Sequence, residues 1–572
     1  MRRTPVVRLL LSILLVAVFG SSSNAQVLQS GLASTLDPAL QARLLFITGH
    51  TRVLVRAASL SELSSVTSLI RVLGGTKVRT LGLITAVAAD VPNLAIETLA
   101  AAPGVAHISL DRLIGGADER TDATIGSADV RRDYGYDGSG VTVATIDSGI
   151  TAWHDDLADA SGATERVDWF VDFINGRTIP YDDYGHGTHV AGIIAGNGAD
   201  SSGQRSGIAP GAHIVALKVL DANGHGRISD VIAAFDYIAS HPELRVRVVN
   251  LSVAAPVYES YTIDPLTIAA RRLVDAGVVV VAAAGNAGRG HNGHTAYGSI
   301  TAPGNAPWVL TVGASSHMGT VDRSDDTMAA FSSRGPTAID AAAKPDVVAP
   351  GVGIESLTDP ASTLYASMSP YLLAGTLTRP YFPYLSLSGT SMATPVVSGT
   401  IALMLQANPS LTPNAVKAIL EYTSQVYAPY DRLSQGAGFL NAKGAVDAAR
   451  AFASPDGIAS RSGDWSGQII WGDRIYSSET IAASAQGFAR AVTWGQTLWL
   501  EPGWTAGPNV VWGSTCGGAD CGLAWTIALG GDSTVATSDD ETVVWGTSDD
   551  DDTVVWGTSC SDPSCAPVVW QP

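Results

Sequence analysis

Five short runs of hydrophobic residues most strongly limit what this chain can fold into. They are VTVATID (141–147), HIVALKVL (213–220), VRVVNLS (246–252), VVVVAAAGN (278–286) and WVLTVGA (308–314). Each run is apolar at consecutive positions, which is typical of strands buried on both faces of a parallel sheet. Helical patterns lie between and after them, at about 189–196, 228–240, 262–276, 394–407 and 411–421. We therefore expect residues 118–453 to form an α/β domain with a doubly wound parallel sheet, whose functional residues lie at the carboxyl ends of the strands.

A smaller unit is predicted before this domain, because a chain of 572 residues is too long for one hydrophobic core. Within residues 26–117, strand patterns at 51–57 and 105–110 enclose two helical patterns, near 60–72 and 92–102, and two further strands in 77–89. The order β-α-β-β-α-β favours a small α+β ferredoxin-like fold.

Residues 1–25 have the layout of a secretory signal peptide. Arg2, Arg3 and Arg8 precede an apolar stretch at 9–19, which is followed by Ser23-Asn24-Ala25. The apolar stretch is too short to span a bilayer stably, and small residues after it mark a cleavage site. A buried N-terminal helix is the alternative, and the paired arginines also fit a twin-arginine export route. We expect a secreted, extracellular protein without a membrane span, either free or associated with the cell surface.

The C-terminal extension, residues 454–572, is acidic and rich in tryptophan. It holds ten of the thirteen Trp residues and fifteen acidic residues against three Arg, and so carries most of the net charge of −19. The unit VVWG recurs at 510–513, 543–546 and 554–557. This pattern favours a β-rich repeat of hairpins that bury Trp, with a sugar-binding aromatic face as the alternative. An acidic surface argues against nucleic acid as a partner, because phosphates are bound by Lys and Arg.

All four cysteines lie in this extension. They form two pairs with the same spacing, Cys516 with Cys521 and Cys560 with Cys565. In an exported protein this number and spacing favour two disulfides. A zinc site is the alternative, because pairs separated by two to four residues are also typical of zinc ligands. The central region contains no cysteine and must be stable through packing alone.

Two histidines, His186 and His189, lie in YGHGTHVAG (184–192). Taken alone, they could be a metal pair, a catalytic base with a neighbour, or polar residues at a helix start. Asp147 closes a predicted strand, and Ser391 lies in GTSMATP at the start of a helical run. A serine hydroxyl is a weak nucleophile until a base accepts its proton, and a carboxylate must orient that base. The order Asp, His, Ser also excludes the G-x-S-x-G hydrolases, in which the serine comes first.

The segments DSG (147–149), HGTHVAG (186–192) and GTSMATP (389–395) resemble the three signature segments of the subtilisin-like serine peptidases, or subtilases. The likeness extends in order through residues 27–453 and does not include the extension. It implies that Asp147 orients the imidazole, that His186 is the general base and then the general acid, and that Ser391 attacks the scissile carbonyl. His189 then becomes a supporting residue, and the chemistry requires no cofactor.

The resemblance also implies groups that bind the oxyanion and the substrate. Asn286 matches the family's oxyanion asparagine and would act with the backbone N–H of Ser391, although a simple turn residue is the alternative. Two backbone edges that hold extended peptide match Gly224-His225-Gly226 and Ser252-Val253-Ala254. Ala254 departs from the family's usual Ser-Leu-Gly, so we expect a lower affinity for extended peptide with the same binding mode.

The main specificity pocket would be formed by Ala283, Ala284, Gly285 and the region around Thr301. No acidic residue is present at these positions. We therefore expect a neutral pocket that prefers apolar or uncharged side chains, because a basic side chain would be desolvated there without a partner.

Calcium binding at Asp156 has partial support. Asp156 aligns with a carboxylate that is typical of the family's calcium sites, but the downstream loop GNGADSSGQRSG (196–207) lacks the usual asparagine-rich segment. One carboxylate is not a calcium site, so the sequence alone leaves both alternatives, with and without a structural calcium ion.

Residues 26–117 resemble the subtilase inhibitor propeptide, which predicts cleavage near 115–121; a permanent domain is the alternative. The segment at 356–387 is longer than in compact members of the family and is rich in Tyr and Pro, as expected of either a lid or a rim beside the cleft. The predicted function is that of a secreted serine endopeptidase, made as a zymogen, which cleaves proteins or peptides through an acyl-enzyme. The alternative is a surface or matrix protein whose Trp-rich tail is the functional part.

Overall fold

The computed structural model describes residues 49–81, 85–110, 117–159, 162, 164–290, 294–472 and 474–495, together with the short segments 35–36, 40, 505–506 and 553–555. The predicted signal peptide and all four cysteines therefore lie outside the described residues. Two compact units, residues 1–114 and 115–572, make up the chain and are described separately. Among the described helices, none is both long and apolar enough to cross a membrane.

The N-terminal unit has the predicted β-α-β-β-α-β order. Its elements are β1 (His50–Ala57), α4 (Leu63–Val72), β2 (Thr76–Leu81), β3 (Ala86–Pro92), α5 (Asn93–Ala100) and β4 (Val105–Leu110). The four strands form a sheet in the order β2-β3-β1-β4, in which the three pairs are antiparallel. The helices bury residues at helical spacing, such as Val66 and Ile70 of α4, against alternate residues of β1, such as Val53 and Val55.

The second unit is built around the predicted parallel sheet. Its central strands are β5 (Thr142–Asp147), β7 (His213–Lys218), β9 (Val246–Leu251), β10 (Val279–Ala283) and β11 (Leu310–Ser316). All five confirm predicted strands, and almost all of their residues are buried. The strand order is β12-β11-β10-β9-β5-β7-β6, where β12 is Thr327–Met328 and β6 is Val167–Asp172, and β13 (Val347–Pro350) is also paired to β11. Only β12 (Thr327–Met328) is antiparallel to its neighbour within this sheet.

Three strands of the sheet, β6, β12 and β13, were not predicted. The edge strand β6 (Val167–Asp172) is exposed or half-buried at all positions except Asp172, and so lacks the continuous buried apolar run of a central strand. The strand β13 spans only four residues and β12 only two. All three join the sheet through tertiary pairing, which a local pattern does not reveal.

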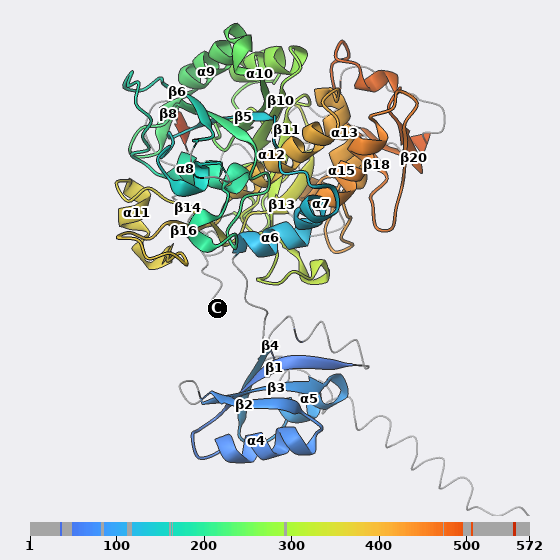
Figure 1. Ribbon diagram of the computed structural model, residues 1–572. Coiled ribbons are helices and arrows are strands. Elements are labelled where there is room, and N and C mark those ends of the chain that lie inside the picture. Colours follow the sequence, from blue (N-terminus) through green and yellow to red (C-terminus); the bar gives the residue numbers. More distant parts are fainter. Residues whose placement is uncertain are drawn as a thin grey trace, which may run out of the picture. The chain divides into compact units, whose positions relative to one another are not determined.

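Five helices confirm predicted helical segments: α8 (His186–Ala195), α9 (Ile228–Ser240), α10 (Pro265–Asp275), α12 (Thr390–Ala407) and α13 (Pro413–Thr423). The helices α6 (Ala117–Ile125), α7 (Ser127–Tyr134), α14 (Arg432–Gln435) and α15 (Ala442–Ala451) were not predicted. The long helix α12 contacts β9, β10, β11 and β13 and is flanked by α8 and α15, whereas α9 and α10 pack on each other. Figure 1 shows α12 in the middle of the domain and α9 and α10 at its upper edge.

The long segment before Ser391 forms a small antiparallel sheet of its own. It contains β14 (Ile354–Leu357), α11 (Thr363–Ser367), β15 (Leu372–Leu373) and β16 (Tyr384–Leu387). The strand β16 pairs with both β14 and β15 and leads directly into α12. We call residues 358–383, between β14 and β16, the strap.

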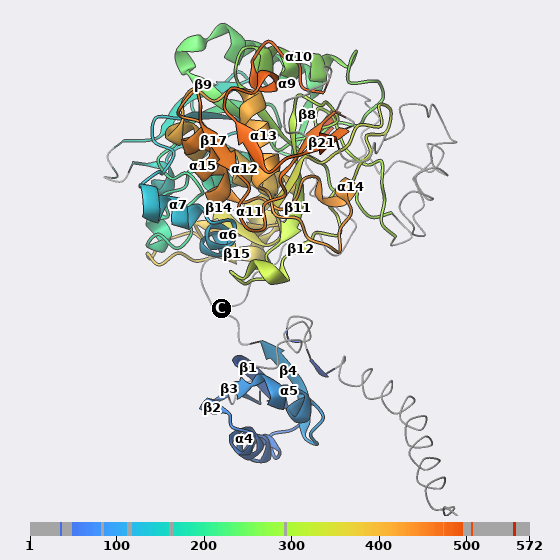
Figure 2. The same cartoon turned by 90° about the vertical axis from the view of Figure 1, so that its right-hand side faces the viewer.

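The first strands of the extension belong to the second unit and pack on its helices. The strand β17 (Ile458–Ser460) contacts α15 (Figure 2), and β18 (Gln468–Trp471) contacts α13 (Figure 1). Trp471 and Trp494 are buried in the main hydrophobic core, with ring centroids 4.2 Å apart. Further strands here are β19 (Arg474–Ser477), β20 (Thr480–Ala482), β21 (Thr505–Ala506) and β22 (Thr553–Val555). The preference for buried tryptophan therefore holds for these two side chains, whereas the VVWG tryptophans lie outside the described residues.

Candidate active site

Asp147 and His186 meet at the carboxyl end of β5. Asp147 is the last residue of that strand, and His186 is the first residue of α8. The imidazole Nδ1 lies 2.7 Å from Asp147 Oδ1, and both side chains are buried. A carboxylate at Nδ1 fixes the ring's orientation and the tautomer in which Nε2 can accept a proton. The structure thus brings together two of the predicted site residues with the geometry of a base and its orienting acid.

A second carboxylate, Asp182, fixes the turn that carries His186. Asp182 Oδ1 accepts hydrogen bonds from the Gly185 amide at 2.7 Å and the Ser148 hydroxyl at 2.8 Å. The Ser148 hydroxyl oxygen in turn accepts the Gly187 amide at 2.8 Å. A Cβ at Gly187 would lie 2.3 Å from the Gly149 carbonyl oxygen, so only glycine allows α8 to approach the loop after β5 this closely. Sequence reasoning did not identify Asp182 or Ser148.

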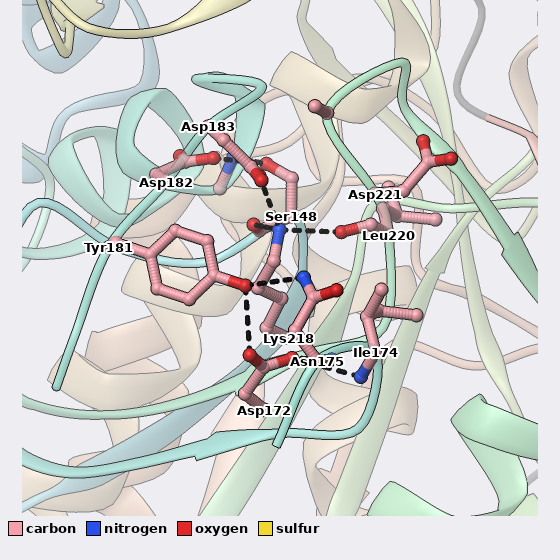
Figure 3. Close-up of polar contacts among 12 residues, drawn as sticks. Ser148, Asp172, Ile174, Asn175, Tyr181, Asp182, Asp183, Lys218, Leu220 and Asp221 are labelled. Carbon is pink, nitrogen blue, oxygen red and sulfur yellow. Dashed lines mark hydrogen bonds and ion pairs between the residues drawn. The ribbon is translucent and has the colours of Figure 1, made fainter. Parts of the chain in front are cut away.

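A buried lysine at the end of β7 connects three loops of the site. The Lys218 ammonium donates to the Asp183 carboxylate at 2.6 Å, the Leu220 carbonyl at 2.7 Å and the Ser148 carbonyl at 2.5 Å (Figure 3). These three partners belong to the turn before His186, the segment after β7 and the turn after Asp147. Lys218 therefore holds the loop of the base to the loop of its orienting acid. Its sequence signal is a lysine within an otherwise apolar strand, HIVALKVL.

Ser391 is the second residue of α12, where the chain leaves the sheet. Its hydroxyl donates to the Ser252 carbonyl at 2.9 Å, and the Ser252 hydroxyl donates to the Ser391 carbonyl at 2.8 Å. This reciprocal pair attaches the start of α12 to the end of β9. Hydrogen bonds of catalytic groups often form fully only when substrate is bound, so the bond to Ser252 is compatible with a nucleophilic role.

Asn286 follows β10 and points toward the start of α12. Its Oδ1 accepts the Thr390 backbone amide and the Thr390 hydroxyl, each at 2.9 Å. With the carbonyl oxygen held in this way, the Nδ2 group carries the donors that remain. The Thr390 hydroxyl oxygen also accepts the Gly285 amide at 3.2 Å, which ties the loop after β10 to the nucleophile helix. Thr390 is a further residue that sequence reasoning missed.

His189 is completely buried one turn along α8. Its Nε2 lies 2.9 Å from the Leu385 carbonyl oxygen in β16. Burial lowers the pKa of His189 to about 3, because a charged imidazole would be desolvated there. A neutral ring that anchors α8 to β16 agrees with the supporting role expected for this residue.

The two predicted substrate edges flank these groups. Gly224 precedes β8 (His225–Arg227), and Ser252, Val253 and Ala254 follow β9 directly. A Cβ at Gly224 would lie 2.6 Å from the ring of Tyr184, which is two residues before His186. The Val219 amide, just before this loop, donates to the Asp147 carbonyl at 2.7 Å. The first edge therefore begins beside the Asp147 and His186 loops.

The residues predicted for the specificity pocket also lie together. Ala283 and Ala284 are buried, and the backbone amide and hydroxyl of Thr301 donate to the Ala284 carbonyl at 3.1 and 3.2 Å. Gly285 has φ +101°, and a Cβ there would lie 2.8 Å from Thr301 Cγ2. The side chains of these four positions carry no charge.

Asp156 lies in a separate buried group with His154 and Asp200. One potential ligand atom of each residue lies within 4.8 Å of the others. However, Asp156 Oδ1 accepts the Asp200 amide at 2.8 Å, and Asp156 Oδ2 accepts the Tyr384 hydroxyl at 2.7 Å. Calcium binds six to eight oxygens, whereas this group offers two carboxylates and an imidazole nitrogen, and each oxygen of Asp156 already accepts one protein hydrogen bond. The donor set at Asp156 therefore does not fit a calcium site.

Comparison with known proteins agrees with this geometry. The model of the subtilase family matches residues 138–446. The serine protease AprX of Bacillus subtilis is 40% identical over 315 residues, which are 54% of this chain and 66% of that protease. Subtilisin E of Bacillus subtilis is 32% identical over 366 residues, which are 64% of this chain and 81% of subtilisin E. Subtilisin Savinase of Lederbergia lenta is 34% identical over 312 residues, or 54% of this chain and 93% of that enzyme. The chain therefore belongs to the subtilase family of serine-type endopeptidases.

Proposed function

We propose that this chain is a secreted serine endopeptidase in which Asp147, His186 and Ser391 form the catalytic triad. The buried 2.7 Å contact between His186 Nδ1 and Asp147 Oδ1 carries the proposal. A buried imidazole that a carboxylate orients at the carboxyl end of a parallel sheet is the base that a serine nucleophile requires.

In the proposed reaction, Ser391 Oγ adds to the scissile carbonyl carbon while its proton passes to His186 Nε2. Asp147 stabilises the resulting imidazolium. The tetrahedral oxyanion accepts hydrogen bonds from Asn286 Nδ2 and the Ser391 amide. Collapse expels the amine, which takes the proton from His186, and leaves an ester on Ser391. Water then attacks this ester with the same proton transfers, which releases the acid and restores the serine.

The substrate is proposed to bind as an extended strand between Gly224-His225-Gly226 and Ser252-Val253-Ala254. The uncharged side chains at Ala283, Ala284, Gly285 and Thr301 support a preference for apolar or uncharged residues before the cleaved bond. A peptide library tests this preference. Dominant cleavage after Arg or Lys would contradict it.

The same proposal includes the chain's processing. Residues 1–25 would direct export, residues 26–117 would inhibit as a propeptide, and residues 118–453 would form the peptidase domain, followed by the extension at 454–572. The β-α-β-β-α-β order of the N-terminal unit supports the propeptide role. No cofactor is assigned to the chemistry, and the filled donor set at Asp156 argues against calcium there.

Casein hydrolysis by the secreted protein is the direct test. The Ser391→Ala variant should lose hydrolysis and remain unprocessed, whereas wild type should begin near residues 115–121 by N-terminal sequencing. Equal hydrolysis by both proteins would disprove the catalytic assignment. An active form that still begins near residue 26 would disprove the propeptide alone.

A further inference from the structure

The buried cluster around Asp156 holds two carboxylates and therefore needs a source of positive charge. Its three members, His154, Asp156 and Asp200, are almost fully buried. Two carboxylates in a low-dielectric site repel each other unless a cation or several donors compensate them. The origin of this compensation decides whether the fold depends on a metal ion.

The ligand atoms of this cluster are largely occupied by protein donors. Besides the two bonds to Asp156 described above, His154 Nδ1 accepts the Asp156 amide at 3.3 Å, and His154 Nε2 lies 3.2 Å from the Pro383 carbonyl oxygen. The ring is therefore protonated on Nε2 and has no lone pair left for a metal. Within the described part of the chain, Asp200 Oδ2 is the one carboxylate oxygen of this cluster without a hydrogen-bond partner. A single oxygen is far from the six to eight that calcium binds.

Arg379, from the strap, brings the positive charge. Its Nε donates to Asp200 Oδ1 at 2.7 Å, and its guanidinium also pairs with Asp155. The Thr376 amide, three residues earlier in the strap, donates to the Asp200 carbonyl at 2.8 Å. The strap therefore supplies both a fixed cation and a backbone donor to the loop that contains Asp200.

We infer that Arg379 does in this cluster what a bound cation would do, and that the strap makes the stability of the domain independent of calcium. The loop at 196–207 does not wrap an ion, because Asp200 in that loop is already bound by strap residues. This role also accounts for the length of the segment before Ser391. It acts as a brace on the Asp156 cluster.

Thermal unfolding of the full chain tests this inference, with Ser391→Ala as the background to prevent self-digestion. The Tm should be the same in excess EDTA and in millimolar calcium. Arg379→Met should lower the Tm by several degrees, because Asp200 is then a buried carboxylate without its cation, and Arg379→Lys should recover part of the loss. Arg132→Met is the matched control, since Arg132 forms exposed ion pairs on α7, and it should melt like the parent.

Two results would overturn the inference. One is a parent Tm that falls in EDTA and returns with calcium. The other is an Arg379→Met protein that melts like the Arg132→Met control. Because the background lacks Ser391, both outcomes are independent of whether the proposed catalytic assignment is correct.

A second observation, independent of the first, concerns the repeat unit of the extension. The strand β22 pairs antiparallel with β8, with Thr553 opposite Arg227, Val554 opposite Gly226 and Val555 opposite His225 (Figure 1). This is the edge proposed to hold extended substrate. The chain of β22 runs from Arg227 toward His225, and so toward the Gly224 end that lies beside Tyr184.

We propose that the TVVWG segment of the extension competes with substrate for β8, which rests on the proposed function of this edge. Backbone pairing with an exposed edge accepts many sequences, so a tethered strand and a substrate peptide can use the same groups. The identical unit TVVWGTS occurs at 542–548 and at 553–559, which gives two copies that could pair in turn. A tether raises the effective concentration of such a strand to the millimolar range.

Proline in both copies should release the edge. In Val543→Pro/Val554→Pro, each copy loses a backbone N–H, and we expect the KM for a short uncharged peptide to fall about two- to tenfold with kcat unchanged. Ser533→Pro/Ser538→Pro, which places two prolines outside the repeats, is the control and should match wild type. Hydrogen exchange at residues 224–227 in the Ser391→Ala background should become faster only in the first variant.

Unchanged KM and unchanged exchange would disprove the competition. Absence of hydrolysis in every active-serine protein would instead disprove the proposed function, while the exchange measurement would still report whether the extension binds β8.

Discussion

Asp147 at the end of β5 and Asp156 in the loop that follows are both buried carboxylates, but they differ in how their oxygens are hydrogen-bonded. Asp147 Oδ1 binds the His186 imidazole and the Ser148 amide, whereas its Oδ2 finds no hydrogen-bond partner among the residues that the structure describes. Both oxygens of Asp156 are bound by protein donors. Buried polar atoms are normally satisfied, and exceptions concentrate where chemistry takes place. The contrast separates a carboxylate positioned for reaction from one that stabilises the fold.

Replacing each carboxylate by its amide is the strongest test of this contrast. Asp147→Asn should lower kcat about 10⁴-fold, because the amide favours the wrong imidazole tautomer. Asp156→Asn should keep kcat near wild type and lower the Tm, because it alters a structural cluster. Rates normalised by active-site titration with a serine-reactive inhibitor would check both. Similar losses of kcat in the two variants would remove the distinction.

Replacing the proposed oxyanion donor, Asn286, should cause the next largest loss of kcat. We expect Asn286→Leu to lower kcat about 10²- to 10³-fold with little change in KM, which is the loss measured for such a donor in subtilisin itself. The reason is that the Nδ2 donor acts on charge that exists only in the transition state. A variant that raised KM and kept kcat would show that Asn286 binds substrate instead.

His189, completely buried in α8, should affect the stability of the domain in acid. The pKa of His189 is lowered to about 3 from an ordinary value of 6.5, so its contribution is fully present above pH 6.5 and is lost as the pH falls toward 3. The slope from one such group is at most about 1.4 kcal/mol per pH unit. His189→Gln should therefore flatten the fall of unfolding free energy over this window, as measured by urea denaturation. An unchanged slope would contradict the assignment of a neutral buried ring.

Thr390 offers the smallest and most specific change. Thr390→Val removes the hydroxyl that donates to Asn286 Oδ1 but keeps the backbone amide that donates to the same oxygen. The loss of one such hydrogen bond, about 1 kcal/mol, corresponds to a fall in kcat of about fivefold. Combining this change with Asn286→Leu should add no further loss, because Thr390 acts through Asn286. If the losses of kcat in the two single variants added up in the double variant, Thr390 would not act through Asn286.

Most of the sheet could be predicted because its strands are buried on both faces. The runs at 213–220 and 246–252 contain few polar residues, so their apolar pattern and their length are sufficient to predict buried strands. The edge strand β6 exposes Trp169 and so lacks this pattern. The strap could not be predicted, because Arg379 finds its partners at Asp155 and Asp200, which are distant in the sequence.

Only the site residues that lie within recognisable sequence motifs could be predicted. Asp147, His186, Ser391 and Asn286 lie in short characteristic segments, whereas Lys218 and Asp182 act through loops that only the folded chain brings together. Lys218 has a recognisable sequence signal, because it is a charged residue within an apolar strand. Asp182 has no such signal, because an aspartate in a polar loop is usually solvated.

Arg379 is part of the polypeptide, and this changes the ways in which the domain can be inactivated. A bound ion has a dissociation constant, so dilution or a competing chelator can strip it from a folded molecule. A covalently attached guanidinium cannot be lost to the medium. Inactivation through the Asp156 cluster then has to be a unimolecular event, with a rate set by temperature and pH and the same in hard and soft water.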